Sequence, residues 1–110
     1  MMDSTRWSKF SLFEQLAHIG SEIARARVWE EKGDLLTRNR SIERAFELID
    51  LTINDERFQT RLKEVLRLKE CLTDIYDGTR VYETSLQGLE EYCDQFALAV
   101  RKNYCPQFGS

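Results

Sequence analysis

Apolar residues recur every three or four positions in four separate stretches of the chain, and this spacing constrains the fold more than any other feature. In the first stretch they are Leu12, Leu16, Ile19, Ile23 and Ala26. At about 100° per residue, side chains with this spacing share one side of an α-helix. The chain of 110 residues has only five glycines, and its single proline, Pro106, follows the last stretch, so little interrupts the helical pattern.

Three further apolar stripes predict three more helices. Their members are Ile42, Ala45, Phe46, Ile49 and Ile53, then Phe58, Leu62, Val65, Leu66, Leu72 and Tyr76, and finally Leu86, Leu89, Cys93, Phe96, Val100 and Tyr104. The four predicted helices span approximately 11–32, 38–54, 57–77 and 85–104. A chain of this length buries one modest core, so we predict a single all-α domain over residues 1–110, folded as an antiparallel four-helix bundle.

Local signals set the ends of these helices and the closeness of their packing. Ser11 followed by Glu14 is a capping-box pattern, and Gly33 and Gly78 are expected where the first and third helices stop. The ends 1–9 and 105–110 carry no such pattern and are expected to be flexible. Small residues on one side of the first helix should let a neighbouring helix approach unusually closely; they are Ala17, Gly20 and Ala24.

A second interpretation concerns residues 29–49. Trp29, Gly33, Leu36, Ala45 and Ile49 are spaced like the signature residues of a tetratricopeptide helix pair. One such unit cannot bury its own apolar face, and no second copy follows at the expected period. The sequence therefore disfavours a repeat array but is compatible with a repeat-like helical hairpin inside a bundle.

The single histidine, His18, restricts the chemistry that the chain can support. A carboxylate-bridged di-metal bundle needs two Glu-x-x-His units, and the sequence has none. No Ser or Cys lies at a motif spacing from His18, and there is no Gly-rich phosphate loop. The scattered cysteines, Cys71, Cys93 and Cys105, disfavour zinc and are typical of reduced thiols. We therefore predict no catalytic residues, no metal and no cofactor.

No apolar run approaches the ~20 residues of a membrane span. The stretch "MMDSTRWSKF" lacks the apolar core of a signal peptide. We expect a soluble, cytoplasmic protein without a membrane partner.

The polar side of the first helix is the leading candidate binding surface. His18, Glu22, Arg25 and Trp29 fall within roughly 40° of one another around the helix axis. An ion pair on a solvated face would already explain Glu22 and Arg25. Trp29 is either an interface anchor or a side chain folded over the helix end.

Two leucines of the second helix, Leu48 and Leu51, lie off its core face and complete the candidate binding face. Either another helix of the bundle or a partner should cover them. Near the apolar side of the third helix, Arg61 and Lys69 would be costly if buried alone, so they should pair with acids such as Asp50 or Glu22. The candidate ion network between helices comprises Arg44, Glu47, Asp50, Arg61, Glu64 and Lys69.

Charge is unevenly distributed along the chain, although the formal net charge is only -3. The stretch from Arg57 to Lys69 is basic, whereas the stretch from Asp74 to Asp94 is acidic. The basic stretch makes RNA a second possible partner.

The stretches "SLFEQLAHIGSEIARA", "ERAFELIDLTI" and "RLKEVLRLKECLTDIY" resemble a family of small, uncharacterised helical proteins from bacteria and archaea. This resemblance covers most of residues 11–76 and implies a shape without a mechanism. By shape alone the chain is also similar to the four-helix HEPN class, which includes ribonucleases and partners of minimal nucleotidyltransferases in toxin–antitoxin pairs. Its nucleolytic members carry an Arg a few residues before a His. Arg6 lies too far before His18, so only a partner-binding version fits.

These observations favour a non-enzymatic protein-interaction or adaptor module, binding either another protein or a second copy of itself as a homodimer. The alternative is an RNA-linked, catalytically silent, HEPN-like partner in a toxin–antitoxin or nucleotidyltransferase system.

Overall fold

The computed structural model describes residues 4–78 and 84–102. Its elements are α1 (Ser4–Trp7), α2 (Leu12–Glu31), α3 (Leu35–Ile53), the 3-10 helix η1 (Glu56–Arg61), α4 (Leu62–Asp77) and α5 (Leu86–Lys102). The described part of the chain has five α-helices, four of them long, and no strand, which confirms the predicted all-α class. The expectations for Tyr104, Cys105 and the end 105–110 lie outside the described residues, as does the side chain of Val100.

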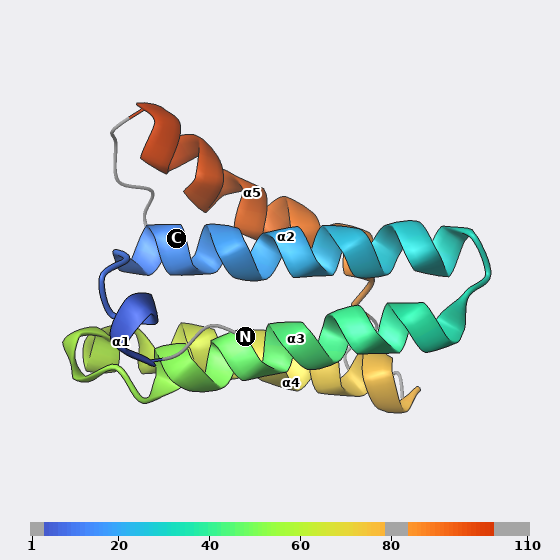
Figure 1. Cartoon of the computed structure of the whole chain (residues 1–110), viewed down its shortest axis with the longest axis horizontal. Coiled ribbons are helices and arrows are strands. Elements are labelled where there is room, and N and C mark those ends of the chain that lie inside the picture. The colour runs from blue at the N-terminus through green and yellow to red at the C-terminus, as the bar shows by residue number, and fades with distance from the viewer. Residues whose placement is uncertain (1–3, 79–83, 103–110) are drawn as a thin grey trace.

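The helices are arranged around an antiparallel hairpin formed by α2 and α3 (Figure 1). In Figure 1, α4 lies along α3 and α5 lies along α2, both behind the hairpin. The two rear helices barely touch each other, and α5 diverges from α2 toward its C-terminal end. One face of the hairpin therefore packs against α4 and α5, and the other faces the viewer of Figure 1.

Local hydrogen bonds explain where most helices begin and end. At the start of α2, Ser11 Oγ accepts from Glu14 N at 3.2 Å while Ser11 N donates to Glu14 Oε1 at 2.9 Å, which confirms the capping box. Gly33 and Gly78 have φ of 79° and 76°, as expected for left-handed residues after a helix. The second helix begins earlier than predicted, because Asp34 caps it by accepting from Thr37 N at 3.0 Å.

The third predicted helix differs from the sequence interpretation in its first turns. Residues Glu56–Arg61 form the 3-10 helix η1, and Phe58 (φ -112°, ψ 19°) breaks the helical geometry before α4 starts at Leu62. The buried stripe of α4 includes Leu68, which the prediction left out, and excludes Leu66, which is 40% exposed. Within α4, Leu68 shares one side of the helix with Val65, Leu72 and Ile75, whereas Leu66 points away from that side.

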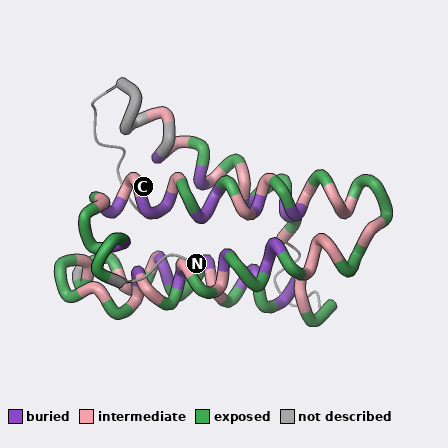
Figure 2. Tube along the Cα trace, viewed as in Figure 1, coloured by how far each residue is buried: buried purple, intermediate pink, exposed green. Residues whose placement is uncertain are grey.

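The hydrophobic core is built from the inner sides of the four long helices (Figure 2). All five residues of the predicted α2 stripe are buried. The other long helices contribute Ile42, Ala45, Ile49, Val65, Leu68, Leu72, Ile75, Leu86, Leu89, Cys93 and Phe96. Burial of this apolar surface is the main stabilising term of such a domain.

Helices α2 and α5 approach each other closely at Gly20. A Cβ atom placed on Gly20 would lie 2.6 Å from Cys93 Cβ, much closer than carbon atoms normally pack. This contact confirms the close approach predicted from the small residues of the first helix. Arg27 of α2 also pairs with Glu90 of α5 beside this crossing.

Within the end that the sequence analysis expected to be flexible, residues 4–9 are described, and Trp7 packs into the core. Trp7 of α1 is buried, with 1% of its surface exposed, and its Nε1 donates to Thr52 Oγ1 at 3.1 Å. Its carbonyl oxygen accepts from Gln15 Nε2 at 3.0 Å. Because an indole buries a large apolar area, α1 docks onto the end of the α2–α3 hairpin.

Candidate functional site

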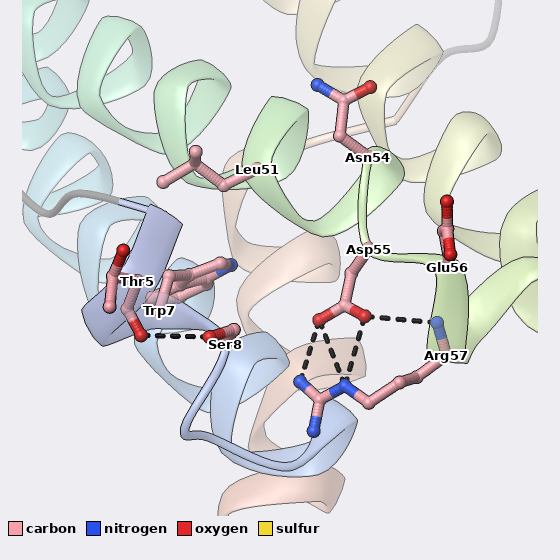
Figure 3. Close-up of a pocket in the computed structure, with 8 residues that line it drawn as sticks. All are labelled: Thr5, Trp7, Ser8, Leu51, Asn54, Asp55, Glu56 and Arg57. Carbon is pink, nitrogen blue, oxygen red and sulfur yellow. Dashed lines mark hydrogen bonds and ion pairs between the residues drawn. The ribbon is translucent and has the colours of Figure 1, made fainter.

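Two surface clefts follow one side of α3 and share Trp7 as a common wall. The first, which we call the α2–α3 cleft, has a volume of about 340 Å³ and is lined by Trp7, His18, Ser21, Glu22, Arg25, Arg44, Glu47 and Leu48. The second, the α1–α3 cleft, has a volume of about 740 Å³ and is lined by Thr5, Trp7, Ser8, Leu51, Asn54, Asp55, Glu56 and Arg57 (Figure 3). Together we call them the α3 groove.

The structure distributes the predicted binding face along this groove. His18, Glu22 and Arg25 of α2 lie with Leu48 of α3 in the α2–α3 cleft, and Leu51 lies in the α1–α3 cleft. Trp29 lines neither cleft. It is half-buried near the end of α2, where Lys32 Nζ lies 4.8 Å from its ring centre. Trp29 is therefore separate from the two clefts, and its ring contacts Lys32 at the end of α2.

One shielded carboxylate holds two arginines in the α2–α3 cleft. Glu22 Oε2 lies 3.0 Å from Arg25 Nη1, and Glu22 Oε1 lies 3.2 Å from Arg44 Nε. The Glu22 side chain is 13% exposed, whereas those of Arg25 and Arg44 are 59% and 50% exposed. Arg44 Nη2 also donates to Ser41 Oγ at 3.1 Å. We call Arg25, Glu22 and Arg44 the arginine clamp.

Aromatic rings form the wall of the α2–α3 cleft next to the clamp. The ring of His18 lies 4.8 Å from that of Phe10 and 5.8 Å from that of Trp7, measured between ring centres. His18 thus extends an aromatic surface that includes the buried indole. Sequence reasoning placed His18 correctly on the polar side of α2 but missed Phe10 and Trp7, because neither belongs to a periodic stripe.

In the α1–α3 cleft an ion pair borders the apolar side chains of Trp7 and Leu51 (Figure 3). Arg57 Nη2 lies 2.7 Å from Asp55 Oδ2, and Arg57 Nε donates to Asp55 Oδ1 at 3.0 Å. These hydrogen bonds lower the pKa of Asp55 below its usual value. Arg57 Nη2 also donates to the carbonyl oxygen of Phe10 at 3.0 Å, which fixes the guanidinium at the rim of the cleft.

The six residues of the predicted ion network are divided among several places. Lys69 Nζ of α4 lies 2.8 Å from Asp50 Oδ1 of α3, which is the pairing that the sequence suggested. Arg44 and Glu47 belong to the α2–α3 cleft, Arg61 lies at the start of α4, and Glu64 lies at the groove between α4 and α5. An interhelical hydrogen bond from Tyr76 to Glu43, at 2.7 Å, escaped the sequence analysis.

The basic stretch of residues 57–69 is largely matched by acids of the same chain. Arg57 pairs with Asp55, and Lys69 pairs with Asp50. Arg67 Nη1 lies 3.9 Å from Glu70 Oε2. These ion pairs reduce the net positive charge that the sequence indicates for the surface of residues 57–69.

Among the described residues, no three His, Cys, Asp or Glu side chains gather in a group that could hold a metal ion. Each helix in the described ranges is too short or too polar to cross a membrane. The resemblances noted from the sequence stay predictions, because no protein-family model, curated protein or solved structure matches the chain.

Proposed function

We propose that this protein is a non-enzymatic protein-interaction module that binds a segment of its partner in the α3 groove. The observation that carries the proposal is the position of Trp7, which lines both the cleft that contains Leu48 and the cleft that contains Leu51. Leu48 and Leu51 are the apolar side chains that a partner can reach in the groove, because Trp7 has only 1% of its surface exposed, and charged side chains line the same clefts. Apolar centres with polar rims are typical of protein-binding surfaces.

The arrangement of the helices supports this choice of surface. In the proposal, the four long helices act as an antiparallel bundle in which α4 and α5 cover one face of the α2–α3 hairpin. The residues that line the α3 groove come from α1 and the residue after it, from α2, from α3 and from the segment that follows α3, and none of them belongs to α4 or α5. Leu48 and Leu51 are half-buried there, so a partner that covers them gains apolar contact.

The charges along the groove favour a protein over RNA. Glu47, Asp55 and Glu56 line it, and acidic side chains repel a phosphate backbone. Most basic side chains of residues 57–69 already pair with acids of the same chain. The partner is therefore another protein or a second copy of this chain.

Photo-crosslinking from inside the groove tests the proposal. Benzoylphenylalanine replaces Leu48 or Leu51 in the purified chain, which is then irradiated alone and in extract of its native cells. The matched control carries the probe at Leu36, which is 67% exposed on the first turn of α3 and lies outside the groove. We expect protein adducts from positions 48 and 51 but not from position 36.

The mass of the adduct identifies the partner. An adduct of twice the mass of the chain, formed without extract, indicates a homodimer, and a different mass that appears only with extract indicates another protein. Adducts that disappear on nuclease treatment would transfer the proposal to RNA. Equal labelling from position 36, or no adduct from positions 48 and 51, would refute the groove as a binding site.

A further inference from the structure

We propose that the arginine clamp selects a partner segment that carries one acidic side chain beside an apolar residue. The acid would bind between Arg25 and Arg44, and the apolar side chain would lie against Leu48 in the same cleft. This inference rests on the proposed function, since it names the chemistry of the segment that the α3 groove holds.

The hydrogen bonds of the clamp leave donors for a ligand. A guanidinium carries five N–H donors. Arg25 uses Nη1 toward Glu22, whereas Arg44 uses Nε toward Glu22 and Nη2 toward the buried Ser41. Both side chains are at least half exposed. A carboxylate that approaches from solvent therefore meets guanidinium groups whose positions are already set.

The charges of the cleft favour a ligand with no more than one negative charge. The clamp alone carries one net positive charge, which a single Asp or Glu side chain neutralises, but Glu47 lines the same cleft and opposes any further negative charge. A phosphate dianion would leave an excess of negative charge. A polyanion extending along the groove would also meet Glu47 and then Asp55 and Glu56.

The clamp contributes more to recognition than to the stability of the fold. Exposed ion pairs stabilise proteins weakly, so the contacts of Arg25 and Arg44 with Glu22 do little to hold α2 against α3. Their effect is to fix two flexible side chains before a ligand arrives. Prior ordering of this kind reduces the entropy that is lost on binding.

Selection from a random peptide library displayed on phage, with the full chain immobilised, tests the inference. We expect the enriched peptides to carry Asp or Glu within a few residues of Leu, Ile, Phe or Trp. The affinity of an enriched peptide is then measured by fluorescence anisotropy for the unchanged chain and for Arg44→Gln. We expect binding to weaken about tenfold, as for one lost hydrogen bond to a charged group.

Two controls separate a direct contact from a general effect of charge. Arg40→Gln removes the same charge from an exposed position of α3 outside the groove and should leave the affinity unchanged. A peptide with its acid replaced by Gln should bind equally to the unchanged chain and to Arg44→Gln, since the lost contact is the same. Unchanged circular dichroism would show that the Arg44→Gln variant is folded.

The outcomes distinguish this inference from the proposed function. Binding through the groove is shown if Leu48→Ser weakens the affinity of the peptides. If such peptides carry no acid, or bind equally well to Arg44→Gln, only the proposed selectivity for an acid is wrong. If the enriched peptides are indifferent to Leu48→Ser, or if none is enriched, the groove itself is not a peptide-binding site and both proposals fail.

Discussion

The contact between Gly20 and Cys93 leads to a quantitative prediction for Gly20→Ala. The new methyl group would lie 2.6 Å from Cys93 Cβ, whereas carbon atoms in contact are normally about 3.5–4.0 Å apart. Helices α2 and α5 would therefore have to separate by about 1 Å. Overpacking of this kind costs about 1–3 kcal/mol. The upper end applies because the obstacle is a Cβ fixed to a helix backbone rather than the tip of a flexible side chain.

Part of this cost is offset by the gain in helix propensity. Alanine is more favourable than glycine inside a helix by about 1 kcal/mol. The expected net loss of unfolding free energy is therefore about 2 kcal/mol, which lowers the melting temperature by about 10 °C for a domain of this size. Urea unfolding followed by far-UV circular dichroism measures the loss directly.

Second-site variants at Cys93 test the cause of the destabilisation. Cys93→Ala keeps the Cβ atom and should not relieve Gly20→Ala, whereas Cys93→Gly removes that atom and should partly restore the double variant. Gly88→Ala is the matched control, because its added methyl group would meet only Ser85 Oγ, at 3.4 Å. The reasoning is wrong if Gly20→Ala is as stable as the unchanged chain, or if both Cys93 variants relieve it equally.

Three further predictions concern buried or paired groups. Trp7→Phe removes the indole N–H that donates to Thr52 and should cost about 1–3 kcal/mol of unfolding free energy in urea melts, and an unchanged stability would contradict the docking of α1. The pKa of Asp55 is lowered by Arg57, so the ionised carboxylate stabilises the fold. The difference in unfolding free energy between the unchanged chain and Asp55→Asn should therefore be largest above the usual carboxyl pKa. It should shrink as the pH falls through the lower pKa of the folded state, and urea melts between neutral pH and about pH 3 would show this. Burial raises the pKa of Cys93 to about 12, so in a chain without Cys71 and Cys105 this thiol should react with a disulfide reagent at pH 8 only after unfolding, and fast labelling of the native chain would be evidence against its burial.

The parts of the fold that were predicted correctly depend on interactions within one helix or at one turn. The Ser11–Glu14 capping box and the glycine stops at Gly33 and Gly78 are decided by residues a few positions apart. The stripe of α2 follows from the helical period alone. The start of α4 was missed because the 3-10 segment around Phe58 changes the helical phase, and periodicity assumes that the phase is constant.

The candidate site was predicted only as far as one helix can show it. The angular spacing of α2 brings His18, Glu22 and Arg25 together without knowledge of any other helix. The pairing of Arg44 with Glu22 depends on how far α3 is shifted along α2. A single sequence does not give that shift. Trp29 was placed on the binding face by its angle, but its position near the end of α2 puts it outside the groove.

A signal for the docking of Trp7 was nonetheless present in the sequence. Gln15 and Thr52 lie beside the apolar stripes of α2 and α3, and buried polar side chains require partners. Thr52 Oγ1 accepts a hydrogen bond from Trp7 Nε1. It donates its own proton to Gln15 Oε1, which lies 2.8 Å away. The indole N–H of Trp7 is the donor that completes this cluster. Two polar residues on core faces therefore indicate that a further hydrogen-bonding group is buried beside them.

The same cluster shows why the α3 groove should exist before a partner arrives. If α1 undocked, Trp7 would lose its apolar contacts, and the hydroxyl of Thr52 and the amide of Gln15 would lose the partners that Trp7 supplies. Thr52 would keep its bond to Gln15 Oε1, so the cost is the loss of two hydrogen bonds, worth about 0.5–1.5 kcal/mol each, in addition to the lost burial of the indole. Undocking is therefore rare, and the wall that joins Leu48 to Leu51 stays in place. In the proposed function, a partner segment would meet a formed groove, and its binding energy would not be spent on ordering the N-terminal segment.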